Sequence, residues 1–393
     1  MRRLGLWLIV MLLLVGSVRP AAAAWRDLPG EAVGDPRVLA CIEAAVLRGY
    51  LGDSARVSPT APVAREELVV ALVRLLGLEG EAQSLRDAAP GFRDVARILQ
   101  ICPWARGYLA AAQRAGLLSP GGEFRPGEPA SRSWAAELAV RALGLQAEAE
   151  LRMADRLPFS DLRGFPVDRL GYLAVAAGRG LMEGFGDGTF RPQDPLTWFQ
   201  LALLLERMAL RRPGPGGGEV RATLVRVEGP VSALVVRVGT GSPRTYRLAE
   251  DAVVLVDARP ADLADLQPGM LLSLVPGAER RVALVSAASP AGREPATLLG
   301  WLVLVGPGMF GMVPPARWSQ VQCFLDRGWR WRGDLGAYVV PVACGGEGDA
   351  AGVERLLGRL VVARAVRLAE PSAASFQLGQ VREVLLVPGL LGD

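Results

Sequence analysis

The stretch from Phe159 to Leu210 reads FSDLRGFPVDRLGYLAVAAGRGLMEGFGDGTFRPQDPLTWFQLALLLERMAL. It opens with an aromatic-x-Asp turn and continues as an apolar segment that ends at a glycine. A glycine-rich loop ending in Phe-Arg-Pro follows, and a second apolar segment begins after Pro195. Apolar residues at helical spacing on either side of a Gly/Pro loop predict two helices joined by a long connection.

The same unit occurs twice earlier in the chain. Its aromatic-x-Asp start recurs at equal spacing, at Trp25, Phe92 and Phe159. The proline after the loop recurs at nearly the same spacing, at Pro59, Pro126 and Pro192. A fixed long period indicates one supersecondary unit that is too small to bury its apolar face alone, so the copies must pack on one another. The predicted repeats cover 25–91, 92–158 and 159–212.

Each repeat is predicted to hold two helices. In the first two repeats we expect them over 36–48 and 65–76, and over 103–115 and 132–143. A glycine ends the first helix of each repeat, at Gly49, Gly116 and Gly180, as expected for a residue that adopts the left-handed conformation. The aspartates of the aromatic-x-Asp turns, Asp27, Asp94 and Asp161, are expected to cap helices or turns.

After the repeats the pattern changes to short strands. Residues 213–219 form a Pro/Gly linker that cannot continue a helix. Short valine-rich runs separated by Gly, Pro or Asp then predict a small β-barrel or sandwich over 220–288. A second β-rich piece is expected over 297–393, either as another barrel or as the other half of one sandwich. The predicted fold class is therefore multidomain, all-α followed by all-β.

The segment 1–24 has the form of a secretory signal peptide. Two arginines precede an apolar run from Leu4 to Val18, and small residues follow at 21–24. The run is short for a hydrocarbon core of about 30 Å, so export with cleavage is expected rather than a membrane span. Cleavage would remove three arginines and no acidic residue from the 44 basic and 40 acidic residues, which leaves 41 against 40. This balance gives no argument for nucleic acid as a partner.

Missing residue types exclude several chemistries. The chain has no His, Lys or Asn, so every basic residue is an arginine. Without His there is no Ser-His or Cys-His nucleophile pair and no imidazole ligand for a metal. Without Lys there is no Schiff base and no phosphate-binding lysine. No cofactor or metal is implied, and the Gly186–Gly188 turn lacks the alternating oxygen ligands of a calcium loop.

The three repeats resemble S-layer homology (SLH) domains. The segment GFGDGTFRPQDPLT at 184–197 is close to that family's consensus, and the resemblance covers about residues 25–212. It implies an α-helical prism with pseudo-threefold symmetry that binds cell-wall polysaccharide non-covalently in grooves between repeats. The implied ligand is a secondary wall polymer that carries a pyruvate ketal. In the family, the arginine of a T-R-A-E motif at the start of the second helix contacts that anion.

The T-R-A-E motif combines a helix cap with an anion site. Thr followed three residues later by Glu is a capping box. The intervening arginine lies in the first helical turn, where the helix dipole and the planar guanidinium both favour a carboxylate. This chain carries the motif incompletely, as AREE at 64–67, SRSW at 131–134 and TWFQ at 197–200. The first lacks the capping hydroxyl, the second lacks the acid, and the third lacks the arginine.

These positions are the candidate ligand-binding residues. Arg65 and Arg132 are expected to contact the polymer, although a solvated surface arginine is the plain alternative. Trp198 either stacks on a sugar ring or covers the core, and packing is the commoner fate. The resemblance adds the helix-ending glycines Gly49, Gly116 and Gly180, where the polymer would approach the backbone. We expect the first two grooves to carry most of the anion binding.

Four cysteines in an exported chain suggest disulfides. Pairing within each region, Cys41 with Cys102 and Cys323 with Cys344, is the simplest of the three connectivities. Three tryptophans of the last piece, Trp318, Trp329 and Trp331, could form a sugar-stacking platform, but packing is the more common fate.

The sequence therefore predicts a secreted cell-surface protein that is anchored through its repeats to pyruvylated wall polysaccharide and displays a β portion, without enzyme activity. One alternative is a wall-anchored hydrolase that uses two carboxylates of the β portion. Its candidates are Asp326, Asp334, Glu347 and Asp349, and no spacing singles out a pair. Another alternative is a structural envelope protein whose β domains self-associate.

Overall fold

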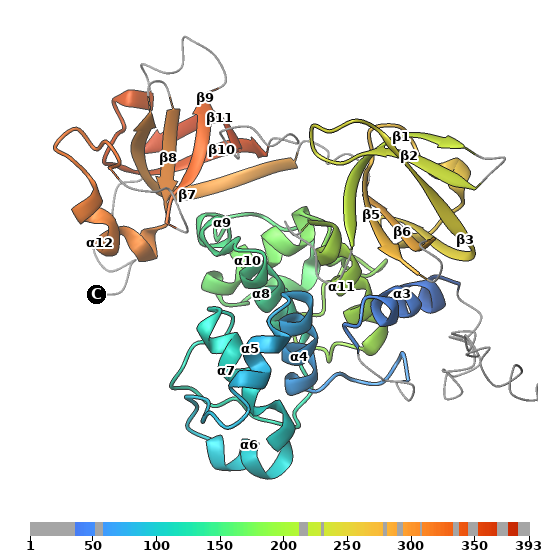
Figure 1. Ribbon diagram of the computed structural model, residues 1–393. Helices are drawn as coiled ribbons and strands as arrows, with labels where there is room; N and C mark the ends of the chain where they lie inside the picture. Colours follow the sequence, from blue (N-terminus) through green and yellow to red (C-terminus); the bar gives the residue numbers. More distant parts are fainter. Residues whose placement is uncertain are drawn as a thin grey trace, which may run out of the picture.

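The chain folds into a helical part that is followed by two β units (Figure 1). The computed structural model describes residues 36–51, 58–211, 219–228, 232–277, 281–288, 294–306, 309–332, 338–344, 353–367 and 376–383. The prediction of a multidomain chain with helices first and strands second is confirmed at this level. The predicted signal peptide at 1–24, the turn with Asp27 and the linker residues 213–218 lie outside the described residues.

The helical part contains the helices predicted from the repeats and several short ones. In chain order they are α3 (Pro36–Leu47), α4 (Arg65–Leu75), α5 (Glu79–Ser84), α6 (Val95–Ile101), α7 (Arg106–Arg114), α8 (Arg132–Ala142), α9 (Gln146–Leu151), α10 (Val167–Gly178) and α11 (Trp198–Arg211). Their apolar residues form one continuous core. Gly49, Gly116 and Gly180 follow α3, α7 and α10 with φ of 73°, 73° and 60°. A positive φ explains why each helix ends at a glycine.

The longer helices pack in a closed order. α4 packs against α7, α8 against α10, and α11 returns to α3. In addition, α4 contacts both α8 and α11. Each second helix of a predicted repeat therefore packs on the first helix of the next repeat, and the last repeat packs on the first.

Backbone hydrogen bonds close the same ring at the starts of α4, α8 and α11. The amide of Val63 donates to the carbonyl of Leu196 at 2.8 Å, Leu196 donates to Ala130 at 2.7 Å, and Ala130 donates to Val63 at 2.8 Å. All three residues are fully buried. A buried amide without a partner is costly, so each of the three segments needs the other two.

Two short helices that the sequence analysis missed fix the close approach of neighbouring helices. α5 packs against α7 and α9 packs against α10. A Cβ added to Gly107 of α7 would lie 2.0 Å from the carbonyl oxygen of Ala82, and one added to Gly171 of α10 would lie 1.7 Å from that of Ala149. Only glycine permits these crossings. Such short helices carry too few apolar positions for their period to be recognised.

The first β unit is a six-stranded sheet in which one edge strand pairs back onto the strand next to the other edge. Its strands are β1 (Val220–Glu228), β2 (Ala233–Arg237), β3 (Arg244–Val256), β4 (Arg259–Pro260), β5 (Leu271–Pro276) and β6 (Val282–Ala288). They pair in the order β2-β1-β5-β6-β3-β4, and an additional β2–β3 pairing closes the sheet. We call this unit the first barrel. β3 is one continuous strand, whereas its valine-rich runs predicted two separate strands, over 244–248 and 253–256.

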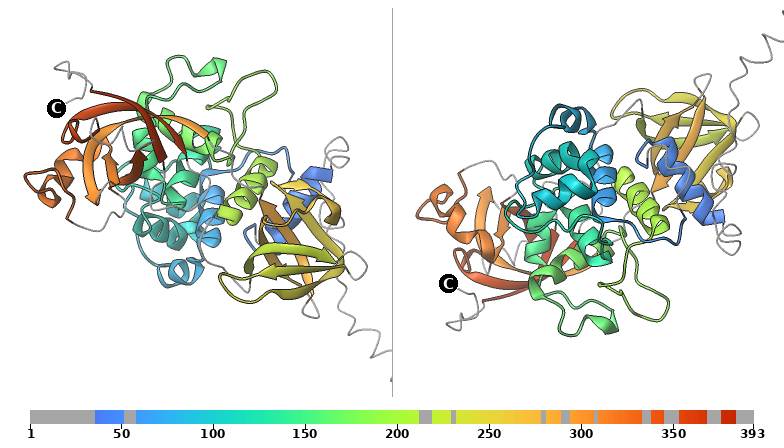
Figure 2. Two further views of the ribbon diagram at one scale, coloured as in Figure 1. Left: turned by 90° about the horizontal axis from the view of Figure 1, so that it is seen from above. Right: turned by 90° about the horizontal axis from the view of Figure 1, so that it is seen from below.

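The second β unit is a separate closed barrel. Its strands β7 (Glu294–Gly306), β8 (Met309–Val313), β9 (Val340–Cys344), β10 (Leu360–Arg367) and β11 (Phe376–Glu383) pair in the order β10-β11-β9-β8-β7. It also carries the short helix α12 (Trp318–Val321). The two β units lie on opposite sides of the helical part (Figure 2).

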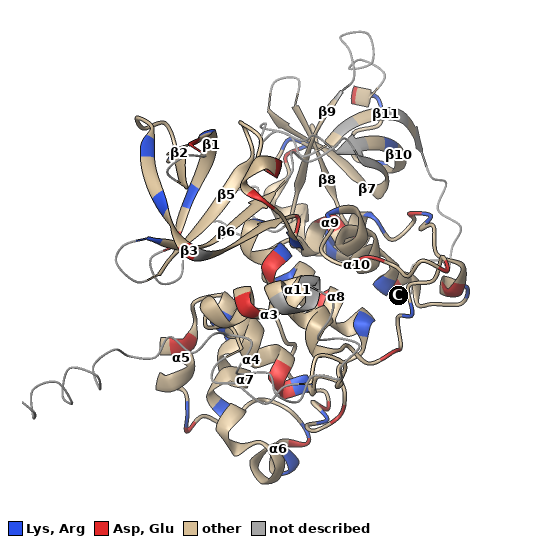
Figure 3. Ribbon diagram, turned by 90° about the vertical axis from the view of Figure 1, so that its right-hand side faces the viewer, with Lys and Arg blue, Asp and Glu red and all other residues tan. Residues whose placement is uncertain are grey.

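Buried polar contacts join the helical part to both barrels. Arg48, at the end of α3, pairs with Glu206 of α11 and with Glu219 before β1, each at 2.9 Å, and donates to Ser273 of β5 at 3.0 Å. Figure 3 shows charged residues at this junction beside α11 and α3. On the other side, α9 contacts β7 and β8, and Arg317 pairs with Glu150 of α9. Both barrels are therefore docked on helices.

Among the described side chains Cys102 and Cys323 are free thiols, and the two predicted disulfides stay predictions. Cys102 is buried in the helical core after α6, whereas α3, which carries Cys41, packs on α11 and on the first barrel. Figure 1 shows α3 and α6 at different ends of the helical part. The prediction paired cysteines of neighbouring repeats, but α3 packs on the last repeat instead. The side chains of Cys41 and Cys344 lie outside the described ones.

We expect Gly171→Ala to destabilise the helical part by about 1–3 kcal/mol, because the added methyl group overpacks the α9–α10 contact. The matched control is Gly80→Ala in α5, where an added Cβ meets no atom within 4 Å. That change should be neutral or stabilising by up to about 1 kcal/mol. Urea unfolding followed by circular dichroism measures both. Equal effects of the two substitutions would contradict the close crossing.

Candidate functional site

Two aspartates hold the Phe-Arg-Pro loops in place. The carboxylate of Asp94 accepts hydrogen bonds from the amides of Phe124 and Arg125 at 2.8 and 2.7 Å. Asp161 does the same for Phe190 and Arg191, at 2.9 and 2.7 Å. The sequence analysis expected these aspartates to cap helices or turns. Instead, each bridges from the start of its repeat to the loop that follows the repeat's first helix.

The loops in turn hold the candidate arginines. The carbonyl of Phe124 accepts a hydrogen bond from Nε of Arg65 at 2.6 Å, and the carbonyl of Phe190 accepts one from Nε of Arg132 at 3.0 Å. Each guanidinium is thereby fixed at the first turn of its helix, with its terminal nitrogens directed away from that bond. The guanidinium keeps this position only when the neighbouring repeat is correctly folded, because that repeat supplies the carbonyl.

The capping interactions follow the sequence expectation at each of the three helix starts. Glu67 accepts from the amide of Ala64 at 2.8 Å, so the first helix keeps the acidic half of the box. Ser131 accepts from the amide of Trp134 at 3.3 Å, which is the hydroxyl half. Thr197 and Gln200 form both halves, at 3.2 and 3.3 Å.

Arg65 lies in a wide groove between the first two predicted repeats. Its guanidinium stacks on Trp134, 3.7 Å from the ring centroid, and the side chain is half-buried. Burial lowers the pKa of Arg65, and nearby Glu128 acts in the opposite direction. Its terminal nitrogens have no hydrogen-bond partner among the described residues. The groove has a volume of about 720 Å³. Its lining residues include Arg93, Arg125, Arg141 and Arg169, and also Glu123, Glu128 and Glu137.

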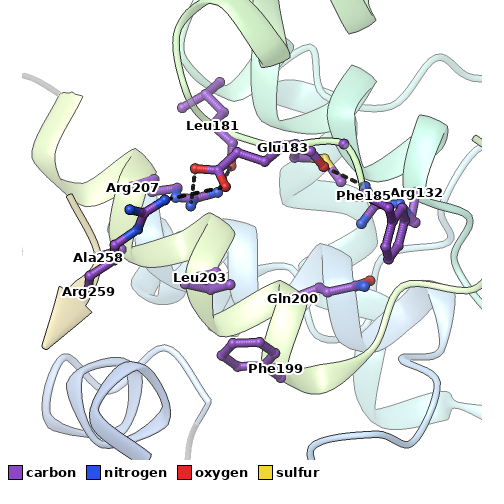
Figure 4. A pocket seen from close by; sticks show the side chains of 12 residues that line it. Arg132, Leu181, Glu183, Phe185, Phe199, Gln200, Leu203, Arg207, Ala258 and Arg259 are labelled. Atoms are coloured by element: carbon purple, nitrogen blue, oxygen red, sulfur yellow. Dashed lines mark hydrogen bonds and ion pairs between the residues drawn. The ribbon is translucent and has the colours of Figure 1, made fainter. Parts of the chain in front are cut away.

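Arg132 occupies the equivalent position between the second and third predicted repeats but is much more enclosed. Only 4% of the residue is exposed, and Nη2 also donates to the carbonyl of Glu183 at 2.9 Å. The guanidinium lies 4.7 Å from the ring centroid of Phe185. Burial lowers the pKa of Arg132 to about 10, against the attraction of Asp194. The cavity beside it has a volume of about 180 Å³ and is partly lined by the first barrel (Figure 4).

Trp198 occupies the third equivalent position, and its side chain is half-buried. It lines a cavity of about 140 Å³ together with Tyr50, Leu51, Arg74 and Trp104. The ring therefore forms part of a groove wall as well as packing against the core. Whether it contacts a sugar stays a prediction.

All three predicted positions thus lie in equivalent grooves. Residues directly after the helix-ending glycines form the other wall in each: Tyr50 and Leu51, Leu117 and Leu118, or Leu181 and Met182. Sequence analysis missed Trp134 and Phe185, whose rings lie against the guanidinium groups of Arg65 and Arg132. Trp134 lies within the quoted SRSW segment and Phe185 within the consensus loop. Their positions in these two motifs were the signal that could have identified them.

The Gly186–Gly188 segment is a tight turn. Hydrogen bonds from the hydroxyl of Thr189, the guanidinium of Arg191 and the amide of Thr189 lower the pKa of Asp187 to about 2. These bonds use the carboxylate within the turn. Among the described residues, no group of three acidic or cysteine side chains is placed to hold a metal ion.

The second barrel arranges its tryptophans differently from the expectation. Trp301, Trp318 and Trp329 stack in sequence, with centroid distances of 4.4 and 5.8 Å, whereas Trp331 is buried beside Phe324. Of the four candidate carboxylates, only Asp326 lies within the described residues. It accepts hydrogen bonds from the amides of Arg330 and Gly328, which lower its pKa.

Comparison with known proteins identifies part of the helical region. Residues 158–202 match the S-layer homology domain family. Over 195 residues the chain is 28% identical to "Cell surface glycoprotein 1" of Acetivibrio thermocellus, in an alignment that covers 48% of this chain and 8% of that protein. The chain therefore spans less than a tenth of that relative's length. The two likenesses support a cell-surface, S-layer-associated localisation. Within the described residues, no helix has both the length and the apolar character to cross a bilayer.

Asp161→Asn should lower the stability of the helical part by on the order of 1 kcal/mol, since one acceptor of the loop clamp is lost and the site is exposed to water. Burial alone would raise the pKa of Asp161, but hydrogen bonds from Phe190 and Arg191 outweigh it and lower the pKa. The wild-type advantage is therefore present above the ordinary Asp pKa and is lost as pH falls through the lowered value. Urea midpoints from pH 7 to pH 2 measure this, with Asp87→Asn at an exposed surface pair as control.

Alkylation should distinguish the two described thiols. Burial raises the pKa of Cys102 to about 11, and the side chain lies in the core. Cys323 is exposed. We expect iodoacetamide at pH 8 to label Cys323 at least tenfold faster than Cys102 in the folded protein, and both equally in urea. Protection of Cys323 in the folded protein, relieved by a reductant, would show that it is bridged.

Proposed function

We propose that residues 25–212 are three SLH repeats that anchor the protein non-covalently to a pyruvylated cell-wall polysaccharide, and that the two barrels are displayed from this anchor. The matched segment covers only the third repeat. The closed order of helices and the ring of hydrogen bonds through Val63, Ala130 and Leu196 support extending the assignment to the other two. Three equivalent units related in this way would form the pseudo-threefold prism that the resemblance implies.

The Arg65 groove is the site that supports this function best. Its guanidinium is held by Phe124 through Nε and by stacking on Trp134, which leaves the terminal nitrogens for a ligand. A planar fork fixed in advance suits a carboxylate, because little side-chain entropy is lost on binding. This preorganised arginine in an open groove is the observation on which the proposal depends.

The surroundings of Arg65 favour an anionic polymer. Arg93 and Arg169 line the same groove and form no ion pair among the described residues. Arg125 and Arg141 are balanced by Glu123 and Glu137, at 3.4 and 2.8 Å. Glu128 also lines the groove, so the arginines exceed the acidic residues there and leave a net positive charge around Arg65. Aromatic and apolar walls from Trp134 and Leu117 are suited to sugar rings.

Binding at one charge-assisted contact is weak. Such a contact contributes about 1.5–3 kcal/mol, so stable anchoring needs sugar contacts along the groove or several chains on one polymer. A repeating polysaccharide meets both conditions. We propose the protein as a binding module without catalysis, because the residues that carry the proposal position a ligand and none is placed to activate a nucleophile.

Arg65→Ala should weaken binding of the full chain to a pyruvylated disaccharide by roughly tenfold to 150-fold, since the charge-assisted contact is lost. The affinity of Arg65→Lys should lie between those of the wild type and Arg65→Ala, because lysine retains the charge but loses the planar fork of the guanidinium. Arg86→Ala, which removes an exposed pair outside the groove, is the matched control. Titration calorimetry measures all three.

Sedimentation with wall sacculi tests the ligand class. Wild-type protein should sediment with intact sacculi and stay in solution with sacculi stripped of the pyruvylated polymer. Equal sedimentation with both would remove this ligand, and unchanged affinity of the Arg65→Ala variant would place the ligand elsewhere.

A further inference from the structure

The turn between β3 and β4 reaches from the first barrel into the helical part. Asp257 and Ala258 form it, with φ of 52° and 59°. Two consecutive left-handed residues are typical of the tight hairpin turn that matches strand twist. Ala258 is completely buried and belongs to the apolar core of the helical part, although its neighbours in sequence belong to the barrel. The turn is therefore inserted between the two units.

This insertion occurs at the Arg132 groove. Ala258 and Arg259 line the cavity beside Arg132, together with Leu181, Glu183 and Phe185 (Figure 4). A second cavity of about 520 Å³ also borders the turn and is lined by Gly180, Asp257 and Pro260 among others. Glu183, Arg207 and Arg259 line both cavities. The turn thus divides one groove into two parts, whereas no described residue of either barrel lines the Arg65 groove.

We propose that the β3–β4 turn is a built-in competitor for the Arg132 groove, so that the first barrel and the wall polymer exclude each other there. The proposal rests on the proposed function, because it assumes that an unobstructed groove of this kind binds the polymer. The polymer then has one open arginine groove in the chain at rest, and a second one becomes available only when the turn lifts out.

The divided groove retains the groups that an anionic ligand needs. Nη1 of Arg132 has no hydrogen-bond partner among the described residues, although the residue is nearly fully buried. Arg207 also reaches the groove, and its Nη2 pairs with the carboxylate of Glu183 at 2.8 Å. The turn and the carboxylate of Glu183 therefore block the opening, although the groups that recognise an anion are present.

Glu183 is the residue that distinguishes this groove from the open one. In the second repeat the equivalent residue, third after the glycine that ends the first helix, is Ser119, which carries no charge. Glu183 also pairs with Arg259 of the barrel at 3.8 Å. Both of these side chains are more than half exposed, so their pair contributes little. The burial of Ala258 therefore does most to hold the turn in place, and Glu183 adds repulsion toward an incoming carboxylate.

Lifting the turn separates β4 from α3, on which it packs, but other contacts still hold the barrel to the helical part. The Arg48 pairs with Glu206 and Glu219 are buried and lie in a different part of the junction. Apolar residues of β3 and α3, among them Leu255 and Ala44, form a further cluster there. Since the competing turn must open before the polymer enters, the apparent affinity of this groove is reduced by the fraction of open molecules.

The test uses full-length chains in an Arg65→Ala background, where the open groove is disabled. Ala258→Asp places a carboxylate beside Glu183, and Asp tolerates the left-handed backbone, so the turn should be expelled while its own conformation is kept. Glu183→Ser introduces the residue type that the open groove has at the equivalent position. It is a second and milder way to open the Arg132 groove. The controls are Ala258→Gly, which keeps the turn small, and Ser232→Asp at a left-handed position of another barrel turn (φ 44°). Titration calorimetry with a pyruvylated disaccharide is the readout, with thermal unfolding of each variant to confirm folding.

We expect the Arg65→Ala chain to bind weakly. Ala258→Asp in that background should raise the affinity at least tenfold above that of Arg65→Ala alone, with one site per chain. Glu183→Ser should restore part of this, the two controls should restore none, and adding Arg132→Ala should abolish the gain. In the wild-type background, Ala258→Asp should change the stoichiometry from one site to two.

No gain from either Ala258→Asp or Glu183→Ser in the Arg65→Ala background, when these variants are folded and the wild-type chain binds at one site, would overturn the competition while leaving the proposed function intact. Two sites per wild-type chain would overturn it as well, because the groove would then be open at rest. Absence of binding by the wild-type chain would instead reject the proposed function.

Discussion

Three buried backbone hydrogen bonds, from Val63 to Leu196, from Leu196 to Ala130 and from Ala130 to Val63, are the constraint on which the helical part depends. Each amide has its partner in a different predicted repeat, so none of these segments can satisfy its own buried groups. The bonds lie immediately before α4, α8 and α11 and fix the starts of these helices around one centre. The first-turn residues Arg65, Arg132 and Trp198 therefore lie in equivalent surroundings, and the grooves follow from the ring rather than from the helices alone.

Much of the helical part could be predicted from the sequence, because its predicted repeats share local signals. The glycines after the first helices and the caps at 64–67, 131–134 and 197–200 act between close neighbours in sequence and could be recognised directly. Asp94 and Asp161 were misassigned, since their partners lie beyond the next helix and the local pattern of an acid before a helix also fits a cap. Gly107 and Gly171 gave no local signal, because a close crossing is a property of two helices.

The β portion was less predictable in its boundaries. β3 runs through residues that the pattern divided into two strands. The apolar run at 381–387 predicts a last strand that begins at 381, whereas β11 begins at 376 in the structure. Strand pairing decides such boundaries, and pairing partners lie far apart in sequence. The inequality of the two arginine grooves was hidden for the same reason. Arg65 and Arg132 have the same local motif position, but only Arg132 has a turn from residues 257–259 against its groove.

The return of α11 to α3 has a consequence for how the chain acquires its structure. Arg48 at the end of α3 meets Glu206 of α11 across 158 residues of sequence. As the chain is synthesised from its N-terminus, α3 therefore has no helix to pack on until nearly the whole helical part has been made. Contacts of such high sequence separation slow folding, because the intervening chain must be ordered first. The first repeat is thus the last of the three predicted repeats to gain the packing partner of its first helix.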